Sequence, residues 1–187
     1  MADYVFAVEG LENIDQVQGL AEDIVRAARM AVNRTTERAR ARGAKEIRKE
    51  VAFPASYLTG ERGRLKVTEK ATAQKLQGKV TGRGRPTSLA RFAKAKAPGK
   101  AGLKVTVKPG STKEMKKAFL LRLPQGSTLT DTQFNLGLAI RLKDGERVQN
   151  KKSMVKLGKG LYLLYGPSVD QVFRDVAKEI SPDTADF

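Results

Sequence analysis

The stretch NIDQVQGLAEDIVRAARMAVNRTTERARARGAKEIRKEVAF, residues 13–53, decides the fold of this chain. Small apolar residues recur in it every three or four positions, which is the spacing of one face of an α-helix. Asn13 and Gln16 resemble a capping box, and Pro54 supplies a stop. At about 1.5 Å per residue, the stretch predicts a rod of roughly 60 Å with one stripe facing a partner surface. The stripe consists of Ile14, Val17, Ala21, Ile24, Ala28, Ala31 and Thr35.

The charges of this region are segregated by sign. Every charged residue before Arg26 is acidic: Asp3, Glu9, Glu12, Asp15, Glu22 and Asp23. The bases that follow are Arg26, Arg29, Arg34, Arg38, Arg40, Arg42, Lys45, Arg48 and Lys49. Three interspersed glutamates offer helical partners to some of them. Because bases outnumber acids threefold here, we expect a surface that binds phosphates or an acidic protein, including the acidic stretch of a neighbouring copy.

The whole chain has 187 residues and a formal net charge of +16. Residues 26–122 hold the excess, with 27 basic and six acidic side chains, whereas residues 1–25 carry −6 and residues 123–187 carry +1. This length suits one structural unit, divided into an amino-terminal segment and long helix, 1–53, and a β-rich body, 54–187. A basic block of this density predicts contact with nucleic acid, an anionic membrane surface or an acidic protein.

The composition argues against an enzyme. The chain has no cysteine and no histidine. It therefore lacks thiol nucleophiles, the usual general base and the commonest ligands of transition metals. We expect no catalytic residue, no metal site and no cofactor. No run of eighteen apolar residues occurs and the first residues are acidic, so we also expect a soluble, unexported chain without membrane contact.

The rest of the chain alternates like strands. Tyr4–Val8 is either a short strand or an apolar anchor, and 54–63 is a turn. Alternating or continuous apolar residues then predict five or six strands, of which 118–123 is covered on both faces. The strand signals are Leu65–Thr68, Leu76–Val80, Leu103–Lys108, Ala118–Leu123, Leu136–Leu142 and Leu161–Tyr165. A final amphipathic helix, capped by Ser168 and stopped by Pro182, presents Val172 and Phe173 as a docking surface. The order predicts an α+β fold with an antiparallel sheet.

Two basic loops interrupt the predicted strands, at 83–101 and 146–159. We expect loops of this length to become ordered against partners. Arg83, Arg85 and Arg91 lie in the first loop, as does Phe92, the aromatic residue placed among bases where a nucleotide base would stack. The glycines around Arg83 and Arg85 have neither the Walker nor the dinucleotide spacing, so a flexible basic loop is the more probable interpretation.

The order of the fragments resembles the minor tail protein Z family of long-tailed bacteriophages and prophages. The fragments are RAARMAVNRTTERARARGAKEI, GKVTGRGRPTSLARFAKAK, GLKVTVKPGSTKEMKKAFLLRL, LGLAIRLKDG and LYLLYGPSVDQVF, within residues 25–176. The most specific parts are Arg85-Pro86 with Leu89 and Arg91-Phe92, Lys117-Ala118-Phe119, and Tyr165-Gly166-Pro167-Ser168.

The resemblance implies a non-enzymatic virion protein that completes the tail at the end nearest the head, assembled in the host cytoplasm. We expect a homo-oligomeric ring, because a protein that caps a tube must match its rotational symmetry. Its partners would be tail tube, tail terminator or neck proteins, with a tape-measure protein or phage DNA as further candidates. The alternative is a basic RNA- or DNA-binding protein of non-virion origin. A nuclease would need clustered carboxylates for Mg²⁺, and the acids here are scattered.

Overall fold

The computed structural model describes residues 4–7, 22–94, 102–129, 134–143, 146 and 153–185. It shows an α+β protein in which every strand pair is antiparallel. The chain forms two compact units. Unit 1 contains Met1–Ile47, Ala55–Gly84 and Val169–Phe187, and unit 2 contains Arg48–Pro54 and Arg85–Ser168. These bounds differ from the predicted division at residue 53, because residues 55–84 and the carboxy-terminal helix belong with the amino-terminal part of the chain.

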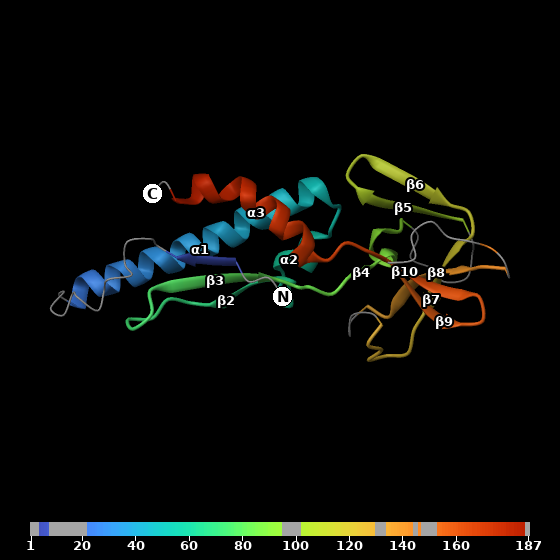
Figure 1. The fold of residues 1–187 in the computed structure, drawn as a ribbon, viewed down its shortest axis with the longest axis horizontal. Coiled ribbons are helices and arrows are strands. Elements are labelled where there is room, and N and C mark those ends of the chain that lie inside the picture. The colour runs from blue at the N-terminus through green and yellow to red at the C-terminus, as the bar shows by residue number, and fades with distance from the viewer. Residues whose placement is uncertain are drawn as a thin grey trace. The chain divides into compact units, whose positions relative to one another are not determined.

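Unit 1 is a three-stranded sheet with helices on one face (Figure 1). The strand order is β1-β3-β2, with bounds Tyr4–Ala7, Gln77–Gly82 and Leu65–Glu69. The helices are α1, Glu22–Glu50, whose last turn belongs to unit 2, the short α2, Ala55–Thr59, and α3, Val169–Ala185. The strand interpretation of the first residues is confirmed by β1. Residues 54–63, predicted as a turn, instead begin with α2, and α3 continues past the stop predicted at Pro182.

The predicted apolar stripe of the long helix is wrong in the part that the structure describes. Ile24 and Ala31 are exposed, while the buried residues of α1 are Val32, Thr36, Ala39, Gly43, Ala44 and Ile47. If the predicted stripe is continued along the helix in steps of three or four residues, it reaches Arg38 and Arg42. The face of α1 that is buried carries no charged residue. Burial of unpaired charge is costly, so the uncharged face packs on the sheet. The predicted helix start at Asn13 lies outside the described residues.

Glycines in β3 bring both long helices close to the sheet. A Cβ atom added at Gly78 would lie 2.0 Å from the Thr36 hydroxyl oxygen and 2.9 Å from its Cβ. One added at Gly82 would lie 2.8 Å from the Asp170 Cα. Gly78, Val80 and Gly82 form the buried face of β3, so α1 and the start of α3 both rest directly on this strand.

Unit 2 is built on a five-stranded sheet with the order β4-β10-β8-β7, to which β9 adds by pairing with β10. The bounds are Thr87–Ser88 for β4, Ala118–Arg122 for β7, Leu136–Arg141 for β8, Met154–Gly158 for β9 and Leu161–Gly166 for β10. A hairpin of β5, Leu103–Lys108, and β6, Ser111–Met115, and the 3₁₀ helix η2, Leu89–Phe92, complete the unit.

The strand that is covered on both faces is β8, not the predicted 118–123. Four consecutive residues of β8, Gly137 to Ile140, are buried between the neighbours β10 and β7. Strand β7 lies at the end of the strand order and alternates between buried and partly exposed residues. Burial of both faces depends on what packs above and below a strand, which its apolar content alone does not reveal.

Three strands of unit 2 were not predicted. Strand β4 is only two residues long, β6 reads STKEM with four exposed residues, and β9 lies within the predicted loop 146–159. Their pairing rests on backbone hydrogen bonds, which polar side chains permit. The predicted loop 83–101 likewise contains β4 and η2 between Thr87 and Phe92. Parts of the two predicted loops lie outside the described residues. They are 95–101 in the first loop and 147–152 in the second, together with 144–145 just before the second loop.

We predict that Gly78→Ala destabilises unit 1 by about 1–3 kcal/mol, the usual cost of adding an atom to a packed contact. The new Cβ would overlap Thr36, which is itself buried and bonded by its hydroxyl to the Val32 carbonyl at 2.7 Å. Urea unfolding followed by circular dichroism measures the change. The control is Gly158→Ala in β9, where a Cβ meets nothing within 4 Å. Equal stability of the two variants would contradict the close contact of α1 with β3.

Candidate partner-binding surface

Four exposed cations follow one another along the solvent face of α1. Arg34, Arg38, Arg42 and Lys45 are spaced by four, four and three residues, so they lie on one side of the helix. That side is opposite the buried face of Val32, Ala39 and Ile47. We call these four residues the basic row; it extends for about 16 Å along the helix. The row leaves the packing of α1 on its sheet undisturbed and presents positive charge to a partner.

The other predicted arginines of α1 differ in their surroundings. Arg26 and Arg29 are exposed near the start of the helix. Arg40 is half-buried, and its Nε donates to the Glu37 carboxylate at 2.9 Å. An exposed pair of this kind contributes little to stability, yet it satisfies Arg40 within the helix. Arg40 is two positions from both Arg38 and Arg42, so it lies on another side of the helix and is not part of the basic row.

An open hollow of about 660 Å³ lies beside the start of α1, between this helix and the turn that connects β2 to β3. Arg29 and Met30 line it from the helix, and Lys70 and residues 71–74 line it from the turn. Asn33 fixes the turn to the helix, since its side-chain amide donates to the Ala71 carbonyl at 3.2 Å and accepts from the Ala71 N–H at 2.8 Å. The sequence gives little indication of this hollow, because Arg29 and Lys70, which lie on its two sides, are 41 residues apart in the chain.

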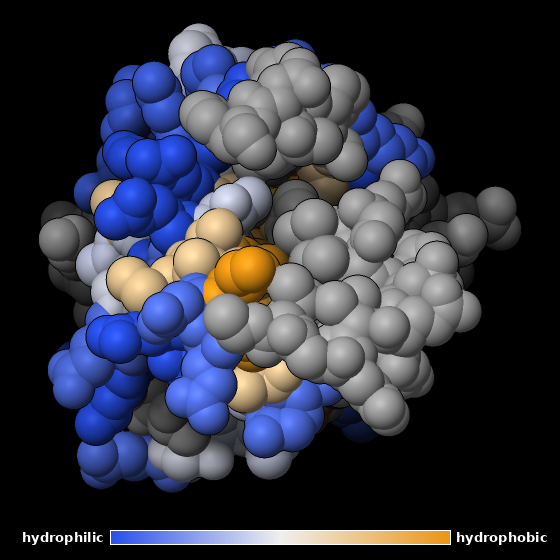
Figure 2. Space-filling model, turned by 90° about the vertical axis from the view of Figure 1, so that its left-hand side faces the viewer, coloured by the Kyte–Doolittle hydropathy of each residue, from blue (hydrophilic) through white to orange (hydrophobic). Residues whose placement is uncertain are grey.

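The part of unit 1 at which α1 begins combines charge with apolar surface. Figure 2 shows hydrophobic surface near the middle of the view, with hydrophilic surface to its left and below it. Among the described residues, Ile24 is 52% exposed and Met30 is 59% exposed, the two highest values for large apolar side chains. Because both belong to the first three turns of α1 and Met30 lines the hollow, apolar and cationic groups meet at this end of unit 1.

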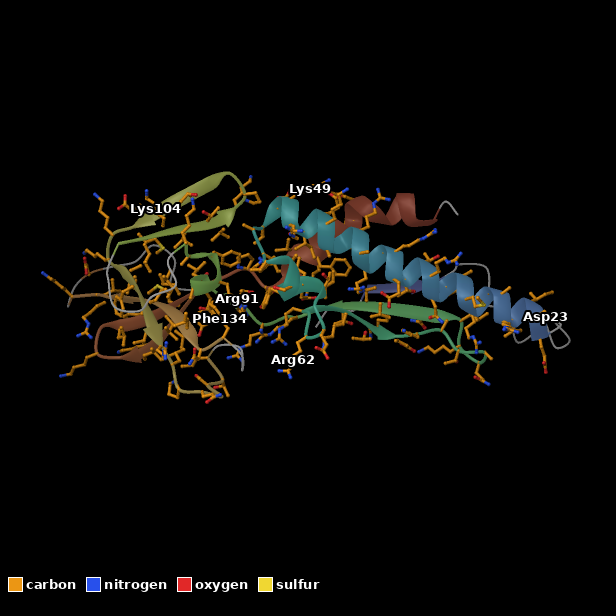
Figure 3. All side chains as sticks on the ribbon, turned by 180° about the vertical axis from the view of Figure 1, so that it is seen from behind. Asp23, Lys49, Arg62, Arg91, Lys104 and Phe134 are labelled. Atoms are coloured by element: carbon orange, nitrogen blue, oxygen red, sulfur yellow. The ribbon has the colours of Figure 1, made fainter. Side chains whose placement is uncertain are left out.

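The predicted binding residues of the first loop are separated by the structure. Arg83 belongs to unit 1, where its guanidinium lies 3.4 Å from the Tyr57 hydroxyl. Arg85 is exposed in unit 2. Arg91 lies over the ring of Phe134, with 4.2 Å between its guanidinium carbon and the ring centroid (Figure 3). This cation–π contact directs Arg91 toward its own unit.

Phe92 does not provide the predicted stacking surface. It is 5% exposed, and its ring centroid lies 5.4 Å from that of Phe53 in a tilted arrangement. The final residue of η2 therefore contributes to the core of unit 2. A ring buried in this way is closed to a nucleotide base, which must stack on an exposed aromatic face.

The predicted docking helix is also part of a core. Phe173 is fully buried and Val172 is 8% exposed in α3, and Ser168 is buried directly before the helix. Asp170 receives a 2.6 Å bond from Arg174, and its backbone N–H donates to the Arg83 carbonyl at 3.1 Å. The apolar side of α3 is thus occupied within unit 1. A partner would have to bind another face of this helix.

A tether in unit 2, not predicted as a site, involves Tyr165 of β10. Its hydroxyl donates to the Leu129 carbonyl at 2.7 Å. Burial raises the pKa of Tyr165 above its usual 10.0, and the nearby charge of Arg85 opposes the rise. The segment that follows β7 is held further by Leu123 N–H, which donates to Asn135 at 2.7 Å, and by the Ser88 hydroxyl, which donates to Leu136 at 3.2 Å.

No group of three acidic, histidine or cysteine residues suited to a metal occurs within the described ranges. Within the same part of the chain, none of the helices is both long and apolar enough to span a bilayer. Comparison of the chain with models of known protein families, with curated proteins and with solved structures finds no match.

We predict that Tyr165→Phe lowers the free energy of unfolding by about 1 kcal/mol at neutral pH, the typical net value of a hydrogen bond. A raised pKa in the folded state means that this stabilisation is present below pH 10 and is lost as the pH rises through the folded pKa. The difference from the wild type should therefore shrink above pH 10. Urea titrations from pH 7 to 11 measure it. Tyr162→Phe is the control, and an equal loss in both variants would exclude the Leu129 bond as the cause.

Proposed function

We propose that this chain is a structural component of a bacteriophage tail that completes the head-proximal end as a homo-oligomeric ring. The observation that carries the proposal is the basic row, four exposed cations on the side of α1 that the fold leaves open. A long charged helix face next to an acidic stretch of the same chain suits repeated contacts between identical copies. Such head-to-tail contacts close into a ring when the rotation between copies allows it.

The resemblance to minor tail protein Z proteins supports the proposal, and two of the fragments that carry it contact each other. In unit 2 the segment with Arg85-Pro86 leads into β4, which pairs with β10 through Tyr165↔Ser88 and Gly166↔Thr87. A Cβ added at Gly166 would lie 3.0 Å from a Leu89 methyl group and 3.4 Å from the Phe92 ring. The residues of two of the three most specific parts thus form one packed structure, as expected for features that maintain a fold.

In this proposal each part of the chain has a mechanical role. The sheets of the two units provide rigid bodies, and α1 offers its basic row to an acidic surface of a neighbouring copy, a tape-measure protein or the end of the DNA. Tail tube, tail terminator or neck proteins would contact the ring from either side. No covalent chemistry is involved, so the function depends on complementary surfaces alone.

The test is the mass in solution, measured by light scattering on the purified chain across a salt series. We expect a discrete multimer at low salt that dissociates as salt screens the contacts of the basic row. The mass should not depend on added short duplex DNA. A monomer at every salt concentration, alone and with the other purified tail proteins, would contradict the ring.

The basic row also favours a second candidate function, binding of nucleic acid by a chain of non-virion origin. Cations spaced along 16 Å or so of helix match several phosphates of a duplex backbone. A monomer that binds free RNA or DNA tightly in the same experiment would support this alternative. The dependence of the binding constant on salt concentration measures the electrostatic part of such binding.

For this alternative we predict that replacing Arg34 and Lys45 by glutamine makes the salt dependence less steep. The negative slope of the log binding constant against log salt concentration should decrease in magnitude by about 1.8, since each phosphate contact contributes about 0.9. Fluorescence anisotropy with a labelled 20-base-pair duplex measures the slope. Lys66→Gln, an exposed residue of β2, is the control. An unchanged slope in the double variant would show that the basic row does not contact the nucleic acid.

A further inference from the structure

We propose that the hollow between α1 and the β2–β3 turn binds the acidic amino-terminal stretch of a second copy of this chain. This inference rests on the proposed assembly of copies and names a second contact between them. It concerns the hollow, which is a different surface from the basic row and lies nearer the start of α1.

The hollow has the chemistry of a site for an acidic and apolar peptide. Arg29 and Lys70 are exposed on its two sides, and none of its lining residues is acidic. Met30 and the methyl groups of Ala71 and Ala73 contribute apolar lining between these cations. A ligand that carries carboxylates on both sides of an apolar side chain satisfies both kinds of group. Neither an inorganic anion nor a bare nucleic acid backbone uses the apolar part.

The walls of the hollow are held in place by the fold. The two hydrogen bonds between Asn33 and Ala71 join the helix to the turn. Within the turn the Thr72 N–H donates to the Lys75 carbonyl at 2.9 Å, and the Lys75 N–H donates to the Thr72 hydroxyl at 3.1 Å. The Lys75 side chain pairs with Glu69. A site with fixed walls loses less conformational entropy when it binds a peptide.

The chain itself contains a ligand of this chemistry. In VEGLENIDQVQGLA, residues 8–21, three acids occur without any base, and they are interleaved with Leu11, Ile14 and Val17. This complementarity of charge and apolar content is the reason for naming a second copy as the partner. Head-to-tail contact between the stretch of one copy and the hollow of the next is a heterologous interface, the kind that generates rings.

Charge exchange tests the contact. The hollow variant carries Arg29→Glu and Lys70→Glu, and the stretch variant carries Glu9→Lys, Glu12→Lys and Asp15→Lys. We expect neither variant to form the wild-type multimer by itself, because each places like charges at the interface. An equimolar mixture should restore the multimer, and so should one chain with all five changes. Light scattering at low salt measures each mass.

A matched control separates this effect from general loss of positive charge. Arg62→Glu with Lys66→Glu reverses two exposed cations of unit 1 outside the hollow. This control variant should retain the wild-type mass. If the hollow and stretch variants assemble as the wild type does, the inference is wrong while the ring stands. If the chain with all five changes forms the multimer and the equimolar mixture does not, the stretch binds the hollow of its own copy. That result would exclude the contact between copies.

A peptide-binding experiment tests the hollow independently of the ring. It applies even if the wild-type chain is monomeric, which would contradict the proposed ring. A fluorescein-labelled peptide with the sequence VEGLENIDQVQGLA is titrated with the full-length stretch variant. We expect anisotropy to show binding that weakens by at least about tenfold when Arg29→Glu and Lys70→Glu are added, as for two reversed ion pairs. Absence of binding, or equal binding to both proteins, would overturn the inference.

Discussion

Close contact between α1 and β3 is the constraint on which unit 1 depends. Gly78 leaves room for the buried Thr36, and Gly82 does the same for the backbone at Asp170. A side chain at either glycine would separate a helix from the sheet and open the core around Val80 and Phe173. The approach also determines which face of α1 is buried. Because the uncharged side of the helix lies on β3, the basic row is exposed to solvent.

The two units place their chemistry differently. In unit 1, charge lies on the outside of a helix and around an open hollow, where it is available to a partner. In unit 2, Arg91 and Phe92, which looked functional in the sequence, pack within the unit, whereas Arg85 is exposed. Phe92 packs on Phe53, Arg91 lies over Phe134, and Tyr165 holds Leu129. Our proposals therefore rest on unit 1 for recognition, and they treat unit 2 as a rigid body that presents other surfaces.

Part of the fold and of the candidate site was predictable for a simple physical reason. Alternation of apolar and polar residues reports burial of one face of a strand, and it located β2, β3, β5 and β8 and the class of fold. The same argument misplaced the buried face of α1, because small apolar residues occupy two adjacent faces of this helix. The cations Arg34, Arg38 and Arg42 were identified, but their separation from the half-buried Arg40 depends on which face of α1 packs on the sheet.

By itself, the sequence determined the segregation of charge, the absence of histidine and cysteine, and the existence of the long helix and of the regularly alternating strands. These properties follow from local composition and period. Only the tertiary structure decided that β8 is the strand covered on both faces, that polar β6 and β9 are strands at all, and that Arg29 and Lys70 border one hollow. Each of these depends on which segments distant in sequence become neighbours, and backbone pairing between them leaves no periodic signal in the side chains.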